Sequence, residues 1–131
     1  MIGLDTNVLV RYIMQDDPKQ AAKATRLIES LSTQSPGFVP IIAVVELGWV
    51  LSSSYGLTRT QLGQAFESLL RTKELVIDRA DQLLKALRLY KTSAADLADC
   101  LIERGASGAG CERTMTFDVG AARVAGMTLI V

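Results

Sequence analysis

Apolar residues gather in short runs along the chain, and longer amphipathic segments separate these runs. The short runs are predicted strands, and they lie at residues 2–4, 38–39, 75–77, 113–117 and 127–131. The segments between them carry apolar side chains at helical spacing, which predicts helices. Strands that alternate with helices of about ten residues or more favour a parallel sheet covered by helices on both faces. The pattern therefore predicts an α/β fold.

Several helix boundaries can be predicted from local sequence. Asp17 and Pro18 open a helix, since proline suits the first helical position. Thr58 and Gln61 have the spacing of a capping box. The glycine-rich residues 105–110 predict a flexible connection. They do not form a dinucleotide-binding loop, because their glycines are in the wrong order and follow a helix instead of a strand.

Length, charge and cysteine content narrow the class of protein. A chain of 131 residues predicts a single domain over residues 1–131. The formal net charge of zero gives no overall argument for nucleic acid or membrane binding, although local patches remain possible. Cys100 and Cys111 lack metal-ligand spacing, which favours a reduced, cytoplasmic protein. No signal peptide is visible, and the apolar residues 38–51 are too few to span a bilayer.

The chain contains no histidine. This excludes Ser-His-Asp and Cys-His nucleophile systems, His general acid–base chemistry and His-ligated zinc. Carboxylates, hydroxyls, lysines and any metal that carboxylates recruit are the remaining means of catalysis.

Acidic residues follow the first and fourth predicted strands. Asp5 comes directly after residues 2–4, together with Thr6 and Asn7, and Asp118 ends the strand at 113–117. Ligands of open α/β sheets bind outside the carboxyl ends of the strands, so Asp5 and Asp118 are expected at that edge. A purely structural interpretation is also open for Asp5, because aspartate is a good helix cap.

Acids inside two predicted helices extend this set. Glu46 is the one charged residue in the apolar helix 41–51, which favours a functional role over a purely structural place on a narrow exposed stripe or in a pair with an arginine. Asp96 and Asp99 are neighbours on one helix face. Asp96 resembles part of a capping box with Ser93, whereas Asp99 lies deeper and is preferred as the functional acid, with Asp96 as a helper. Which of these two is the principal acid stays open.

Carboxylates that share a pocket need a counter-charge. Oxygen-only ligation fits Mg²⁺ or Mn²⁺ best, and such sites suit phosphodiester hydrolysis. The expected metal ligands are Asp5, Glu46, Asp99 and Asp118. Thr116 lies on the same side of its strand as Asp118 and is an expected supporting donor, as are Thr6 and Asn7 beside Asp5.

The ordered set Asp5-Thr-Asn-Val-Leu, Glu46, Ala95-Asp-Leu-Ala-Asp99 and Thr116-Phe-Asp118 resembles PIN-domain ribonucleases, in particular the VapC-type toxins of toxin–antitoxin pairs. The resemblance spans the whole chain. It implies a three-layer fold with a central parallel sheet of about five strands, and Mg²⁺- or Mn²⁺-dependent endonuclease cleavage of RNA. It places acid roles on Asp5, Glu46, Asp99 and Asp118. It also implies a homodimer that a small antitoxin inhibits.

One position departs from the family pattern, and two other functions are alternatives to a nuclease. Many PIN domains carry a further acid soon after the last one, where this chain has Ala122, so a second metal would be held less well. A phosphatase with Asp5 as nucleophile lacks the second aspartate expected two residues later. A non-catalytic α/β module, either a receiver-like regulatory domain or a scaffold that has lost activity, is a further alternative. A receiver would carry adjacent acids after the first strand and a lysine near the last strand, and neither is present.

Overall fold

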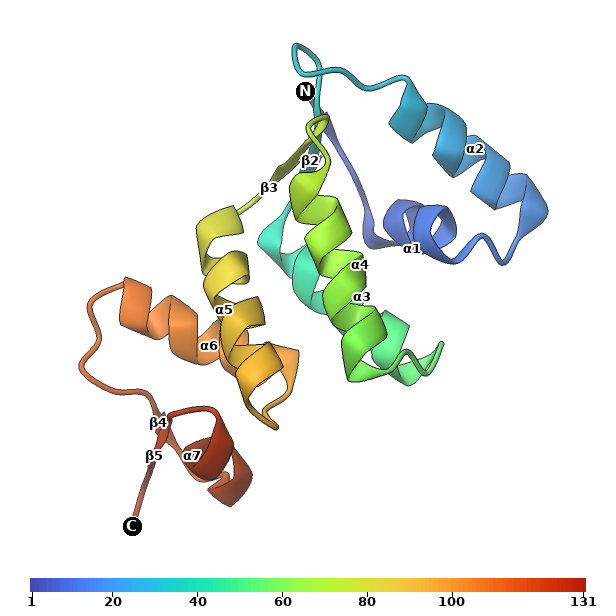
Figure 1. Ribbon diagram of the computed structural model, residues 1–131. Coiled ribbons are helices and arrows are strands. Elements are labelled where there is room, and N and C mark those ends of the chain that lie inside the picture. Colours follow the sequence, from blue (N-terminus) through green and yellow to red (C-terminus); the bar gives the residue numbers. More distant parts are fainter. The chain divides into compact units, whose positions relative to one another are not determined.

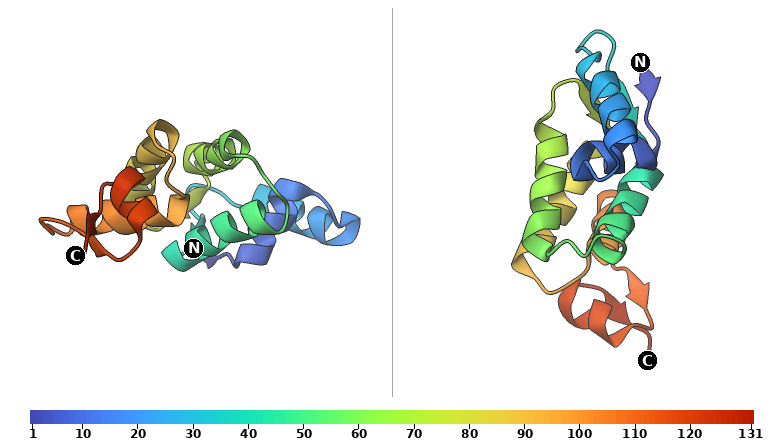
Figure 2. Two further views of the ribbon diagram at one scale, coloured as in Figure 1. Left: turned by 90° about the horizontal axis from the view of Figure 1, so that it is seen from below. Right: turned by 90° about the vertical axis from the view of Figure 1, so that its right-hand side faces the viewer.

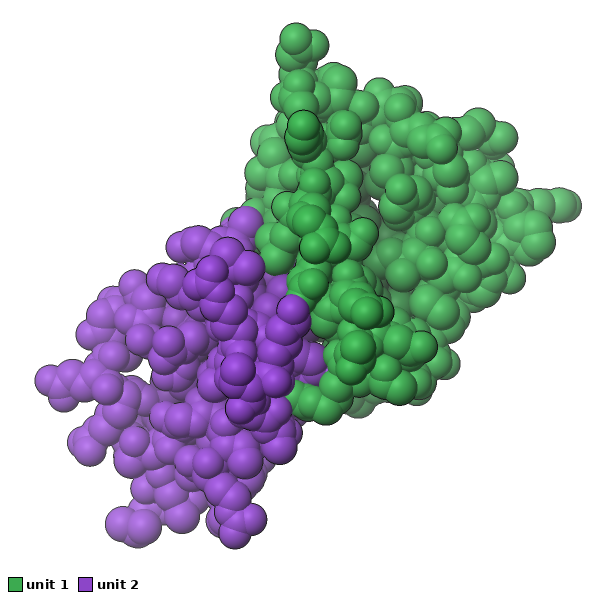
Figure 3. All heavy atoms as spheres, in the orientation of Figure 1, with its two compact units in different colours: residues 1–78 green, residues 79–131 purple.

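The computed structural model describes all of residues 1–131, and it alternates short strands with helices (Figure 1). In chain order the elements are β1 (Ile2–Gly3), α1 (Thr6–Met14), α2 (Pro18–Glu29), β2 (Gly37–Val39), α3 (Ile41–Ser53), α4 (Arg59–Arg71), β3 (Leu75–Ile77), α5 (Ala80–Thr92), α6 (Leu97–Gly108), β4 (Met115–Thr116), α7 (Val119–Val124) and β5 (Thr128–Leu129). The chain divides into two compact units, Met1–Asp78 (unit 1) and Arg79–Val131 (unit 2), which Figure 3 colours separately.

Unit 1 contains a three-stranded parallel sheet in the order β1-β2-β3. Gly3 pairs with Phe38, and Val39 pairs with Ile77. The backbone N–H of Leu4 continues the first ladder by donating to the carbonyl of Phe38 at 2.8 Å. The strands therefore end at a common edge, which places the residues after each strand at neighbouring positions.

The helices of unit 1 begin where local sequence predicts. Asp17 accepts hydrogen bonds from the N–H groups of Lys19 and Gln20 at 3.1 Å, with Pro18 at the first helical position. The capping box of Thr58 and Gln61 forms in both directions and opens α4. Both predictions are confirmed, because each depends on contacts within one turn.

The core of unit 1 lies between the sheet and its helices. Helix α1 packs against α2 and α3, and α4 contacts β3. Leu9 of α1, Leu47 of α3 and Phe66 of α4 are completely buried. Helical spacing predicts these faces, since residues three or four apart lie on the same side of a helix.

Unit 2 is built on the packing of α5 against α6, which lie side by side in Figure 2. Leu83, Leu87 and Cys100 are fully or almost fully buried there. Strands β4 and β5 form a separate parallel pair in which Met115 is opposite Thr128. The predicted α/β class with parallel strands is confirmed. The strands are joined as a sheet of three and a pair, however, and not as one hydrogen-bonded sheet of five.

The prediction of a flexible connection at residues 105–110 is wrong over most of its length, because α6 continues to Gly108. The reason is tertiary packing. A Cβ atom on Gly108 would lie 2.6 Å from Nε2 of Gln82, on α5. The missing side chain at Gly108 leaves room for the end of the Gln82 side chain, and α6 packs along α5 despite the low helix propensity of glycine.

No helix in the structure combines the length and the apolar character that crossing a membrane requires.

Candidate functional site

Asp5 follows the first strand and caps the first helix. Its backbone is extended (φ −78°, ψ 158°), and its Oδ1 accepts a hydrogen bond from the N–H of Thr6 at 2.8 Å. The carboxylate is exposed, and Oδ2 accepts no hydrogen bond. Thr6 is buried and Asn7 is exposed in the same turn. The capping interpretation of Asp5 is therefore correct, and it still leaves one oxygen for a ligand.

A further acid, Asp78, lies at the same edge of the unit 1 sheet. Its N–H donates to the carbonyl of Val39 at 2.9 Å, directly after β3. Its Oδ2 accepts a hydrogen bond from the N–H of Ile41 at 3.1 Å and thereby caps α3, whose own cap residue is Pro40. The sequence analysis missed Asp78, although it follows residues 75–77 as Asp5 follows the first strand.

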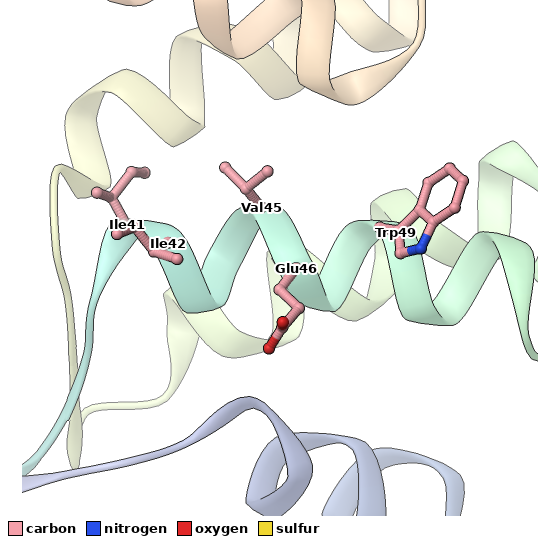
Figure 4. Close-up of a pocket in the computed structure, with 5 residues that line it drawn as sticks. All are labelled: Ile41, Ile42, Val45, Glu46 and Trp49. Atoms are coloured by element: carbon pink, nitrogen blue, oxygen red, sulfur yellow. The ribbon is translucent and has the colours of Figure 1, made fainter.

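Glu46 lies on the exposed face of α3 within unit 1. The large apolar residues around it, Ile42 and Trp49, are 78% and 70% exposed. In Figure 4 the Glu46 carboxylate extends from the side of α3 along which the β1–α1 segment runs, away from Val45. The sequence favoured a functional role for Glu46 over a place on a narrow exposed stripe; in the structure Glu46 is exposed, and its apolar neighbours share the exposed face.

Asp96 and Asp99 open helix α6. Asp96 is the N-cap residue, and its Oδ1 accepts a hydrogen bond from the N–H of Asp99 at 2.7 Å. Ser93 is not the N-cap that a capping box with Asp96 requires, because α6 begins at Leu97 and Asp96 is itself the N-cap. Asp99 therefore lies in the first turn, and its carboxylate is half-buried.

Asp118 follows β4 and caps α7. Its Oδ1 accepts a hydrogen bond from the N–H of Ala121 at 3.1 Å. Its own N–H donates to Oγ1 of Thr116 at 3.0 Å. The threonine hydroxyl thus fixes the backbone from which the Asp118 carboxylate extends, and the carboxylate is exposed with Oδ2 unbonded.

The acids of unit 2 influence one another electrostatically. The pKa of Asp99 is raised above its ordinary value, mainly by burial and then by the negative charges of Asp96 and Asp118. No basic side chain opposes this effect. The structure therefore brings Asp96, Asp99 and Asp118 together within unit 2, whereas Asp5 and Glu46 belong to unit 1.

These donors fit a divalent cation chemically. Every candidate ligand is a carboxylate oxygen, which Mg²⁺ and Mn²⁺ prefer, and the charges around Asp99 lack a positive partner. Within neither unit do three acidic or cysteine side chains gather closely enough to hold a metal by themselves. The expectation that Asp5, Glu46, Asp99 and Asp118 share one ion stays a prediction.

Comparison with protein families identifies the fold. The PIN-domain family model matches residues 2–127, which include every acid described above. A search of curated proteins gives no match. PIN domains are generally nucleases, so the match supports a hydrolase that acts on nucleic acid. The chain belongs to the PIN-domain family.

Proposed function

We propose that this PIN domain is an endoribonuclease that hydrolyses RNA phosphodiester bonds with Mg²⁺ or Mn²⁺. The observation that carries the proposal is that Asp99 lies beside Asp96 in the first turn of α6 and is also subject to the negative charge of Asp118, in a chain of a nuclease family. Like charges held together in this way are costly unless a cation or a proton compensates them. A bound cation is the compensation that suits a nuclease.

Asp5, Glu46, Asp99 and Asp118 would hold the ion, with Asp96 as a helper. When bound, the ion supplies positive charge that activates a water molecule and neutralises the scissile phosphate. Asp5 and Asp118 each have one oxygen fixed by a helix N–H group, so the free oxygen is oriented before any ligand binds.

The supporting residues act through these acids. Thr116 fixes the backbone of Asp118 by accepting its N–H, which is the role expected of a positioning residue. Thr6 fixes Asp5 through its own backbone N–H. Asn7 is exposed in the first turn of α1 and would contact substrate directly.

The biological part of the proposal is a toxin of a VapC-type pair, inhibited by a small antitoxin, active as a homodimer in the cytoplasm. The resemblance of the motifs around Asp5, Asp99 and Asp118 supports this assignment. Exposed Ile42, Val45 and Trp49 on α3 are consistent with a protein partner, since large exposed apolar patches often mark interfaces.

A cleavage assay on labelled single-stranded RNA tests the proposed activity. The wild type should cleave in Mg²⁺ and stop when EDTA is added. Asp5→Asn should abolish cleavage and keep the fold, because asparagine caps helices as well as aspartate does. Asp78→Asn is the matched control, since it removes a charge at the same sheet edge. A fully active Asp5→Asn protein would refute the proposal.

A further inference from the structure

A hollow of about 440 Å³ lies between α1 and α2, the neighbouring helices that follow β1 in Figure 1. Asn7, Arg11, Gln20 and Lys23 supply its polar lining, and Val8 and Leu27 are half-buried apolar residues in it. No acidic residue lines the hollow. Both of its charged lining residues are therefore basic, although the Arg11 guanidinium is ion-paired with Asp16 and the chain as a whole has no net charge.

The guanidinium of Arg11 is held in place by a network of polar groups. Its Nε donates to Oε1 of Gln20 at 2.6 Å, and its Nη1 donates to the hydroxyl of Tyr55 at 3.0 Å and to Asp16 at 3.2 Å. The Tyr55 hydroxyl in turn donates to Asp16 at 2.6 Å. Nη2 makes no hydrogen bond, so its N–H groups are available to an anion.

Lys23 supplies a charge that nothing in the protein compensates. It is exposed on α2, lines the hollow and forms no ion pair. With Arg11 it places two positive groups, from two helices, around one hollow. Such an arrangement attracts a polyanion more than an isolated surface lysine does.

The hollow begins next to the first acid of the candidate site. Asn7 is two residues after Asp5, in the first turn of α1. Arg11 lies one turn further along the same face, about 6 Å along the helix axis. A nucleic-acid strand bound in the hollow would therefore begin next to Asp5.

We infer that the α1–α2 hollow binds the backbone of single-stranded RNA next to the cleaved bond, with Arg11 and Lys23 on its phosphates. The inference rests on the proposed function and specifies its substrate-binding surface. Charge complementarity and continuity with Asp5 favour RNA over a protein segment. Val8 and Leu27 would contact sugar or base, while Asn7 and Gln20 would supply further polar contacts.

The test compares Lys23→Glu with Lys19→Glu, both in the Asp5→Asn background to prevent cleavage. Lys19 is exposed on the same helix but does not line the hollow, so both variants change the charge equally. Binding of a fluorescent single-stranded RNA of about 12 nucleotides is measured against salt concentration. Lys23→Glu should weaken binding about tenfold and reduce the slope of log K against log[salt] by about 0.7, while Lys19→Glu changes neither appreciably.

Circular dichroism and thermal melting check that both variants fold. If the two variants bind RNA with equal affinity, the inference is wrong. A hollow that binds a protein segment instead of RNA would give this result. Failure of the Asp5→Asn parent to bind any RNA contradicts the proposed function itself. The two failures are thus distinguishable.

Discussion

The Oδ2 atom of Asp78 accepts a hydrogen bond from the backbone N–H of Ile41 at 3.1 Å. This acid, which follows β3, thus caps helix α3, which follows β2. Pro40, the residue before α3, offers no side-chain cap. Asp78 lies at the same sheet edge as Asp5, but its carboxylate caps a helix. Substitutions of Asp78 should therefore affect stability, whereas substitutions of Asp5 should affect cleavage.

Asp78→Ala should therefore lower stability without abolishing cleavage. Loss of a helix cap costs about 1 kcal/mol, and urea unfolding of the purified protein measures it. Asp78→Asn should retain most of the stability, because asparagine still offers an acceptor oxygen. An alanine variant as stable as the wild type would contradict the capping role.

Asp99 gives a prediction about pH. Its pKa is raised in the folded protein, so the folded state binds more protons than the unfolded state between the ordinary aspartate pKa and the raised value. Stability should fall as pH rises through this interval in EDTA. At pH 7 Asp99→Asn should melt at a higher temperature than the wild type, and the difference should shrink towards pH 4.

Adding Mg²⁺ should change the relative melting temperatures of the wild type and Asp99→Asn. A cation on the carboxylates removes the repulsion among Asp96, Asp99 and Asp118 and stabilises the wild type, because ligands that bind the folded state raise its stability. The Asp99→Asn protein should gain less. Equal stabilisation of both proteins in a melting titration would contradict a role for Asp99 in metal binding.

Thr116 provides a test of positioning. Thr116→Val keeps the shape and strand propensity of the residue but removes the oxygen that accepts the N–H of Asp118. We expect kcat for RNA cleavage to fall about tenfold or more, as is typical when an outer-shell partner is lost, with KM little changed. Thr116→Ser should restore most of the rate. If serine and valine behave alike, the hydroxyl has no positioning role.

Features that depend on contacts within one or two helical turns were predictable from the local sequence. The helix start at Asp17-Pro18 and the capping box of Thr58 and Gln61 formed as expected. The acids at helix starts were also found, since aspartate after an apolar run both ends a strand and caps a helix.

Features set by tertiary packing were not predictable in this way. Gly105 and Gly108 look like a loop in sequence, but both lie inside α6, which packs against α5. Helix α6 starts at Leu97, so its cap is Asp96 and not Ser93, which directly follows α5. The strands are only two or three residues long, so apolar pattern could not give their exact pairing.

The most direct test of the central claim is Mn²⁺ binding, measured by calorimetry for the wild type, Asp5→Asn, Asp99→Asn and the Asp78→Asn control. If acids from distant parts of the sequence hold one ion, Asp5→Asn and Asp99→Asn should each weaken the same binding event by about tenfold or more, while Asp78→Asn binds like the wild type. Wild-type affinity in either Asp5→Asn or Asp99→Asn would contradict a shared metal site.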